Sequence, residues 1–388
     1  MKRLLTIATT ILFIIAGCAG CKKSGITNDG VITVDVTASY PKKELILQDF
    51  MDVEYVALET NDEFVCQDLV RDVTGSMIIL RNRSQDGNIF IFDRSGRAIK
   101  RINRYGQGGE EYTVYTGIVL DEDRGEIFVN DRPSRRILVY DLDGNFKRVI
   151  RHDDSINVEY MYNFDRDHLI GNNSWQKVDR KVPFAIISKA DGSLRGNIQI
   201  QAKDDINMRA EFEDERYGSY YYAPDMYKGL IPYIESWILV EQSSDTVYRY
   251  RPDHTLTPFI VRTPPVSMDT RIFLLPSMFT DRYYFMDVVK IESELGRDLF
   301  PATHLMYDKE EDALFEYTVY NDDYTDNRPV EINRSNPVNG EIAAYISIQA
   351  PDLIEDYENG KLRGRLAEIA AGLDGESNPV IMLLKYKK

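Results

Sequence analysis

Apolar and polar residues follow one pattern three times between residues 77 and 200. Each copy contains two short apolar segments, a turn with a glycine, and a third segment in which apolar and polar residues alternate, as expected for consecutive β-strands. The turn glycines are Gly96, Gly144 and Gly192, and both intervals between them are 48 residues long. Two equal intervals indicate a repeated structural unit.

A repeat of roughly 40 to 50 residues that contains several short strands is typical of one blade of a β-propeller. Further copies follow at residues 237–256, 282–319 and 342–386. We therefore predict an all-β fold, a six-bladed β-propeller over residues 31–388. Residues 353–373 carry apolar side chains at helical spacing, so we also predict a short helical insertion in the last blade.

Strand-like segments also precede the first copy, within residues 31–60. In a propeller, an early strand commonly completes the last blade, which closes the ring and leaves no open edge. We expect this role for part of the segment.

The first 17 residues have a basic start, an apolar run and small residues, which predict a signal peptide for export. Its end, from Ile15 to Cys18, resembles the bacterial lipobox, in which cleavage precedes a cysteine that receives the lipid. This resemblance implies lipidation of Cys18 and membrane contact through the N-terminal lipid only. Residues 18–30 are polar and suit a tether. A plain secretory signal is the alternative.

Lipidation would place the protein in the cell envelope. In Bacteroidota, acidic residues directly after the lipidated cysteine resemble a signal for display on the cell surface. Cys18 is followed by Ala19 and Gly20 instead. This favours the periplasmic side over the cell surface.

The net charge of −16 limits the partners. An acidic surface repels phosphate backbones and anionic lipid headgroups, so we expect neither nucleic-acid binding nor electrostatic binding to a membrane. Cys66 is the one cysteine after the tether, since Cys18 and Cys21 lie within residues 18–30, and we expect it to be a small buried side chain.

Aromatic side chains are the best candidates for ligand binding. The repeat fades between residues 201 and 225, where Tyr220, Tyr221 and Tyr222 stand together, and Trp175 lies in a widened loop of the third copy. Rings that carry a hydroxyl or an N–H group combine stacking with hydrogen bonding, which suits sugars, peptides and partner proteins. The alternative is that most tyrosines pack between blades, because tyrosine is also a favoured strand residue.

The sequence predicts no catalytic residue, metal ligand or cofactor. It contains no nucleophile elbow and no glycine motif for dinucleotide binding. The histidines lie in different copies and form no His-x-x-x-His pair; they are His152, His168, His254 and His304. A propeller can gather scattered residues around its central channel, so a lyase or hydrolase with a site in that channel is the alternative to a non-catalytic protein.

The whole chain resembles the six-bladed β-propeller lipoproteins of Bacteroidota, relatives of NHL-repeat propellers. The resemblance rests on the lipobox, the strand-turn units that end at Gly96 and Gly144, the connector from Gly106 to Tyr112, and the closing strand after Asn378. It implies a propeller in the cell envelope but no settled activity. We therefore predict a lipid-anchored, non-catalytic binding or scaffolding module for a glycan, a peptide or an envelope protein.

Overall fold

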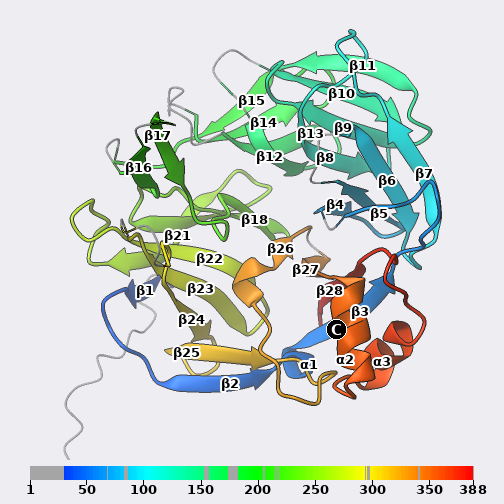
Figure 1. The fold of residues 1–388 in the computed structure, drawn as a ribbon. Helices are drawn as coiled ribbons and strands as arrows, with labels where there is room; N and C mark the ends of the chain where they lie inside the picture. The colour runs from blue at the N-terminus through cyan, green and yellow to red at the C-terminus, as the bar shows by residue number, and fades with distance from the viewer. Residues whose placement is uncertain are drawn as a thin grey trace, which may run out of the picture.

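The computed structural model describes residues 30–387, apart from residues 68, 83–85, 153–155, 157, 174–181, 204–205, 215, 217, 293, 295–297 and 340. Six β-sheets of four or five strands surround a central axis (Figure 1). The predicted all-β class and the six-bladed β-propeller are therefore confirmed.

Blades 1 to 3 are four-stranded antiparallel sheets whose strands follow chain order from the axis outward. Blade 1 contains β4 (Leu69–Val73), β5 (Met77–Arg81), β6 (Asn88–Asp93) and β7 (Ala98–Asn103). Blade 2 contains β8 (Tyr115–Asp121), β9 (Glu126–Asp131), β10 (Arg136–Asp141) and β11 (Phe146–Arg151). Blade 3 contains β12 (Val158–Asn163), β13 (His168–Asn173), β14 (Phe184–Ser188) and β15 (Leu194–Ile198).

Blades 4 to 6 each also include a strand from the N-terminal segment. The main strands of blade 4 are β18 (Leu230–Tyr233), β19 (Ser236–Leu239), β20 (Thr246–Tyr250) and β21 (Leu256–Thr263). Those of blade 5 are β22 (Ile272–Phe279), β23 (Tyr283–Lys290), β24 (Ala302–Asp308) and β25 (Ala313–Tyr320). Blade 6 contains β26 (Asn336–Pro337), β27 (Ile342–Ile348) and β28 (Val380–Tyr386), preceded by the short 3-10 helix η1 (Ile332–Arg334).

The N-terminal segment follows the outside of the ring past three blades. β1 (Ile32–Asp35) pairs in parallel with β21, and β2 (Lys42–Ile46) pairs in parallel with β25. After the one-turn helix α1 (Leu47–Phe50), β3 (Met51–Ala57) pairs antiparallel with β28 and becomes the outermost strand of blade 6. The expectation that part of residues 31–60 completes the last blade is confirmed.

The helical insertion in the last blade is also confirmed, as two short helices between β27 and β28. These are α2 (Ala350–Glu358) and α3 (Gly364–Ala370). Leu353 and Leu366 are fully buried in a cluster that includes Val380 of β28, so the helices pack on blade 6. Among the described residues, no helix is long and apolar enough to cross a membrane.

Six apolar clusters join neighbouring blades and complete the ring. Ile91 of blade 1 shares a cluster with Leu138 of blade 2, and Phe92 of blade 1 shares another with Ile381 of blade 6. Because both faces of a blade contact another blade, both faces must be apolar. This explains why central strands such as β6 and β10 are runs of apolar residues rather than strict alternations.

The turn glycines repeat because each approaches the preceding blade. Gly96, Gly144 and Gly192 have φ values of 88°, 81° and 77°, which residues with a side chain rarely adopt. A Cβ atom at Gly96 would lie 2.0 Å from the carbonyl oxygen of Ala57 in β3, and one at Gly192 would lie 2.4 Å from that of Arg151 in β11. Each glycine thus lets the turn of one blade contact the outer strand of the blade before it.

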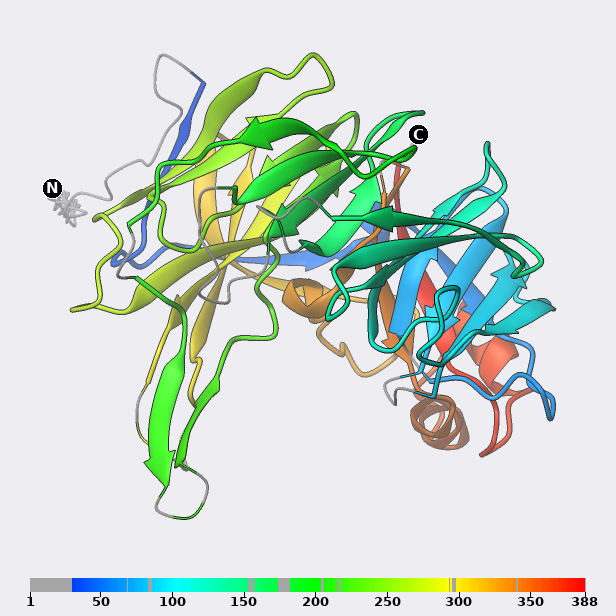
Figure 2. The same cartoon turned by 90° about the horizontal axis from the view of Figure 1, so that it is seen from above.

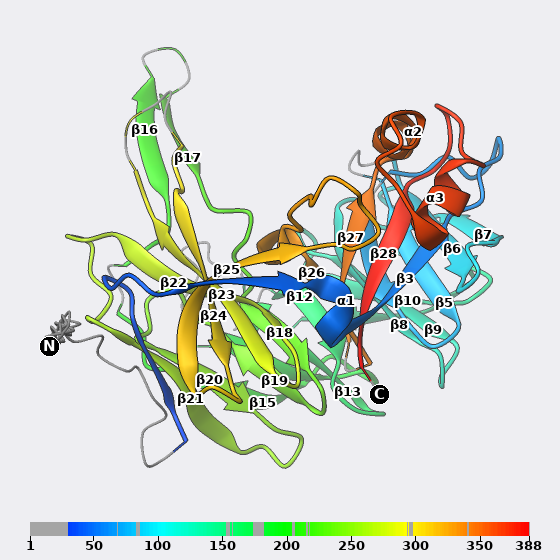
Figure 3. The ribbon, with the colours of Figure 1, turned by 90° about the horizontal axis from the view of Figure 1, so that it is seen from below.

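Between blades 3 and 4, a separate hairpin extends from the ring. It consists of β16 (Ala210–Asp214) and β17 (Gly218–Tyr222), which pair only with each other. Figures 2 and 3 show this hairpin standing out from the blades on one side of the propeller. The predicted insertion at residues 201–225 is therefore a projecting β-hairpin.

Candidate functional site

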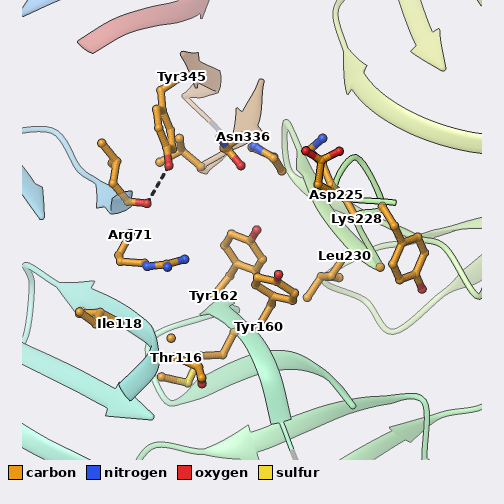
Figure 4. Close-up of a pocket in the computed structure, with 17 residues that line it drawn as sticks. Arg71, Thr116, Ile118, Tyr160, Tyr162, Asp225, Lys228, Leu230, Asn336 and Tyr345 are labelled. Atoms are coloured by element: carbon orange, nitrogen blue, oxygen red, sulfur yellow. Dashed lines mark hydrogen bonds between the residues drawn. The ribbon is translucent and has the colours of Figure 1, made fainter. Parts of the chain in front are cut away.

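The inner strands of the blades surround an axial channel that contains two cavities. The first has a volume of about 110 Å³ and is lined from β4, β8, β12, β26, β27 and the segment leading into β18. The second has a volume of about 100 Å³. Arg71, Met161, Tyr162 and Val338 line both cavities and therefore separate them. The first cavity could hold several water molecules or one end of a ligand; Figure 4 shows its lining.

β-Bulges direct two polar side chains of inner strands out of their ladders. In β4, Val70 pairs with Leu80 and Asp72 pairs with Ile79, so Arg71 is the extra residue. In β8, Thr116 is the extra residue in the same way. A bulged residue is not held by the ladder and can be directed elsewhere. Both bulged side chains line the first cavity.

Arg71 has an unsatisfied guanidinium group. No hydrogen bond or ion pair joins it to another described residue, and its Nε atom is buried without an acceptor. In Figure 4, the guanidinium group points into the cavity toward Tyr160 and Tyr162, two neighbours on β12. A buried donor without a partner costs free energy, so this position favours an acceptor supplied by a ligand.

Positive charge gathers around Arg71. The neighbouring Arg81 lies over the ring of Tyr115 at 5.2 Å, and burial together with the charge of Arg71 lowers the pKa of Arg81 to about 10. Burial and the negative charge of Glu159 raise the pKa of the Tyr160 hydroxyl, and the charges of Arg71, Arg132 and Arg81 oppose that shift. Three guanidinium groups therefore act on one tyrosine at the cavity.

Lys228 lines the opposite side of the first cavity. Its ammonium group donates to the carbonyl oxygen of Asn333 at 2.7 Å. Burial lowers its pKa to about 8, although the charges of Asp287 and Asp225 oppose this shift. Lys228 is thus already hydrogen-bonded and lies near two carboxylates, in contrast to Arg71.

Asp72 lines the second cavity but has a structural role. Burial raises the pKa of its carboxyl group to about 7, against hydrogen bonds that favour the charged form. Its Oδ2 accepts from the amide of Leu120 in β8 at 2.8 Å, and its Oδ1 accepts from the amide of Val73 at 2.9 Å. Asp72 therefore links the inner strands of blades 1 and 2.

The four histidines do not meet in the channel, and none of them lines either cavity. His168 contacts Asp165, His254 contacts Tyr250 and His304 contacts Asp287, each within 2.9 Å. The remaining histidine, His152, is buried in blade 2, and burial lowers its pKa to about 4. Within the described residues, no three His, Cys, Asp or Glu side chains form a group suited to a metal ion.

The predicted ligand-binding tyrosines lie on β17, away from the channel cavities. Tyr220 and Tyr222 contact Phe212 of β16 on one face of the hairpin, at ring distances of 5.7 and 6.0 Å. Tyr221 is on the other face, with Arg209 4.5 Å from its ring. Tyr221 and Tyr222 remain 42% and 48% exposed, so both can contact a partner. Trp175 and Cys18 lie outside the described residues.

The cavity residues Arg71, Tyr160, Tyr162 and Lys228 were not predicted from the sequence. One signal was present: β4 places two charged residues, Arg71 and Asp72, in the strand nearest the axis. The buried Cys66, in contrast, lies as expected. The pattern of apolar residues locates strands, but it does not show which residue leaves the ladder at a bulge.

Fold and cavity together define a six-bladed β-propeller with an axial cavity. Residues 22–335 match the family described as "DUF5128: 6-bladed beta-propeller", and the chain belongs to this family. A Bacteroides fragilis protein described as exported has a similar structure, with a TM-score of 0.60 over 89% of this chain and 99% of its own, at 15% identity. A member of the duf4221 family from Bacteroides vulgatus has a TM-score of 0.47 at 11% identity, over 88% and 99% of the two chains. No curated protein matches this sequence.

Proposed function

We propose that the protein is a non-catalytic binding module of the cell envelope that holds a glycan or a peptide in the mouth of its axial channel. The observation that carries this proposal is the guanidinium group of Arg71, which has no hydrogen-bond partner among the described residues and is directed by a β-bulge into a cavity with two tyrosines. Tyrosine rings offer stacking and hydroxyl groups at little entropic cost. A propeller also keeps such a site rigid, because the inner strands hold it.

The location follows from the leader. Export and lipidation of Cys18 would place the propeller outside the cytoplasm, and the absence of acidic residues directly after Cys18 favours the periplasmic side over the cell surface. The similarity to a Bacteroides fragilis protein described as exported agrees with this location. Metabolic labelling with a lipid precursor tests the anchor: wild-type protein should incorporate the label, and a Cys18→Ala variant should not.

An array of glycans and peptides tests the binding function. We expect wild-type protein to retain a subset of the probes, and Tyr160→Ala to lose that subset because its ring lines the cavity. Tyr357→Ala is the matched control, since Tyr357 is similarly exposed but lies on α2. Equal binding by wild type and Tyr160→Ala would show that the cavity is not the site.

A second proposed surface is the hairpin, which suits an envelope protein rather than a small ligand. It projects from the ring (Figure 3). Its exposed tyrosines, Tyr221 and Tyr222, lie on opposite faces. In a pull-down from envelope extract, Tyr221→Ala should lose a protein that wild type retains. Trp175→Ala tests the other aromatic candidate from the sequence, which lies outside the described residues, and should lose a protein as well. Retention by both variants would remove these residues as the contact.

The competing proposal is a lyase or hydrolase with a site in the channel. The histidines named as its candidates lie outside the described cavity lining. Stoichiometric metal in the purified protein, bound by side chains at the channel, would favour this enzyme over the binding module.

A further inference from the structure

We infer that the ligand group bound at Arg71 is a carboxylate, so that the ligand is acidic: a uronic acid unit of a glycan or the free C-terminus of a peptide. This inference rests on the proposed function and specifies the chemistry of the same site. Both sources offer one planar monoanion at the end of a polar molecule, and the experiment below separates them.

The charge distribution supports an anionic ligand. The whole chain has a net charge of −16, yet Arg71 and Lys228 line opposite sides of the first cavity and Arg81 lies close to Arg71. Asp225 also lines this cavity and acts on Lys228, so Arg71 is the cation left for a ligand. Arg81 and Lys228 already donate to carbonyl oxygens, those of Asn82 and Asn333. Arg71 has no such partner among the described residues. The Nε atom of Arg71 is buried without an acceptor, and a second guanidinium group, that of Arg81, lies beside it. A negative charge from outside would therefore complete the site.

Arg71 also forms no bond between structural elements of the described chain that would account for an arginine at this position. Other arginines and lysines near blade contacts bridge elements. Arg148 bonds both Glu126 of its own blade and the carbonyl oxygen of Lys189 in blade 3, and Lys189 bonds Asp121 of blade 2. Arg71 makes no comparable bond within the described chain. Its position at a bulge, directed into a cavity, therefore indicates a role toward a ligand.

The shape of the group favours a carboxylate. A guanidinium group presents parallel N–H donors that match the two oxygens of a planar carboxylate. One unpartnered cation balances a monoanion, whereas a phosphate group with nearly two charges would require further free donors. The Tyr160 and Tyr162 hydroxyls and the Asn336 amide, which line the same cavity, can bond hydroxyl or amide groups next to the carboxylate.

Isothermal titration calorimetry of the full mature chain tests this inference with paired probes. The sugar pair is methyl glucuronide and methyl glucoside. The peptide pair is N-acetyl-dialanine with a free or an amidated C-terminus. Sodium sulfate is the third probe and represents a non-planar anion. We expect at least one acid to bind about tenfold or more tightly than its neutral counterpart. The pair that shows this difference identifies the source of the carboxylate.

Single-residue variants test whether Arg71 causes the tighter binding of the acidic probe. Arg71→Ala should weaken binding of that acid about tenfold to hundredfold, and Arg71→Lys should restore only part of it, because an ammonium group lacks the planar fork. Arg365→Ala removes an exposed arginine of α3 and should leave the affinity unchanged. Circular dichroism confirms that each variant is folded, and Arg71→Gln replaces Arg71→Ala if the latter does not fold.

Three results would overturn the carboxylate: equal affinity for acid and neutral probes, binding of sulfate alone, or undiminished binding by a folded Arg71 variant. If neutral probes bind and Tyr160→Ala abolishes that binding, the proposed function stands and only the carboxylate is wrong. If no array ligand depends on Tyr160, the proposed function fails as well.

Discussion

At the scale of single residues, close approach and local bulges determine which side chains the fold requires. Gly96 and Gly125 both have positive φ values, 88° and 59°. Gly96 has no space for a Cβ atom, whereas nothing lies within 4 Å of a Cβ atom at Gly125. The two glycines therefore separate the cost of the backbone conformation from the cost of the contact between blades.

We expect Gly96→Ala to lower the free energy of unfolding by more than Gly125→Ala does. The control should cost about 1 kcal/mol for its backbone conformation alone. Gly96→Ala should cost about 2–4 kcal/mol, because the Ala57 carbonyl group must move as well. Urea denaturation of both variants measures the difference. Equal losses would contradict the packing explanation for the 48-residue spacing.

The same scale shows why the fold was predictable and the cavity was not. Gly96, Gly144 and Gly192 are required by backbone geometry, so they recur in the sequence and make the blade repeat recognisable. Arg71 occurs once, and its role depends on a bulge and on residues from four other blades. The tyrosines chosen from the sequence form a cluster, but they lie on the hairpin. Whether they bind a partner stays a prediction.

At the scale of secondary structure elements, the N-terminal strands attach to the ring through charge as well as through backbone pairing. Asp308 of β24 has a fully buried side chain that bonds Lys43 of β2 at 2.7 Å and Arg282 at 2.9 Å. Burial raises the pKa of Asp308, but these two cations and backbone donors outweigh burial and lower it to about 2.

The ion pairs of Asp308 with Lys43 and Arg282 predict that the stability of the protein depends on pH. Because the folded pKa of Asp308 is below its ordinary value of 3.8, the stabilisation is present above about pH 4 and is lost as the pH falls toward 2. We compare the free energy of unfolding of the wild type with that of Asp308→Asn. The difference between them should be about 1–2 kcal/mol larger at pH 5 than at pH 2. Asp269→Asn, at an exposed position, is the control. Denaturation at both pH values gives the result, and a constant difference would contradict it.

Pairing of elements that are distant in sequence limited prediction here. Residues 31–36 alternate between apolar and polar residues, as a strand should, so a strand could be predicted. Its partner could not, because Ile32 pairs with Ile260 of β21, which is far away in the sequence. β18 is four residues long and fully buried, so it carries no alternation and was not distinguished from its surroundings. The helical insertion was predictable because its apolar spacing is local.

At the scale of the whole molecule, the two ends of the described chain close the ring together. β3 pairs with β28 along its full length, and the side chain of Asn378 bonds the backbones of Glu59, Phe64 and Cys66. β1 and β2, in contrast, only extend blades that already have four strands.

Two truncations follow from this difference. A chain that starts at Leu47 lacks β1 and β2 but keeps α1 and β3, so we expect cooperative unfolding at a reduced melting temperature. A chain that starts at Leu58 also lacks β3, which leaves blade 6 incomplete and the adjoining apolar clusters exposed, so we expect no cooperative transition. Differential scanning calorimetry measures both. Cooperative unfolding of the shorter chain would show that β3 is not needed for closure.

The most direct test of the binding site is a crystal structure of the mature protein with the acidic probe that calorimetry identifies. We predict electron density for the ligand in the cavity between Tyr160, Tyr162 and Asn336, with its carboxylate oxygens within hydrogen-bond distance of the Arg71 guanidinium group. Density at the hairpin tyrosines, with none at Arg71, would contradict an axial binding site.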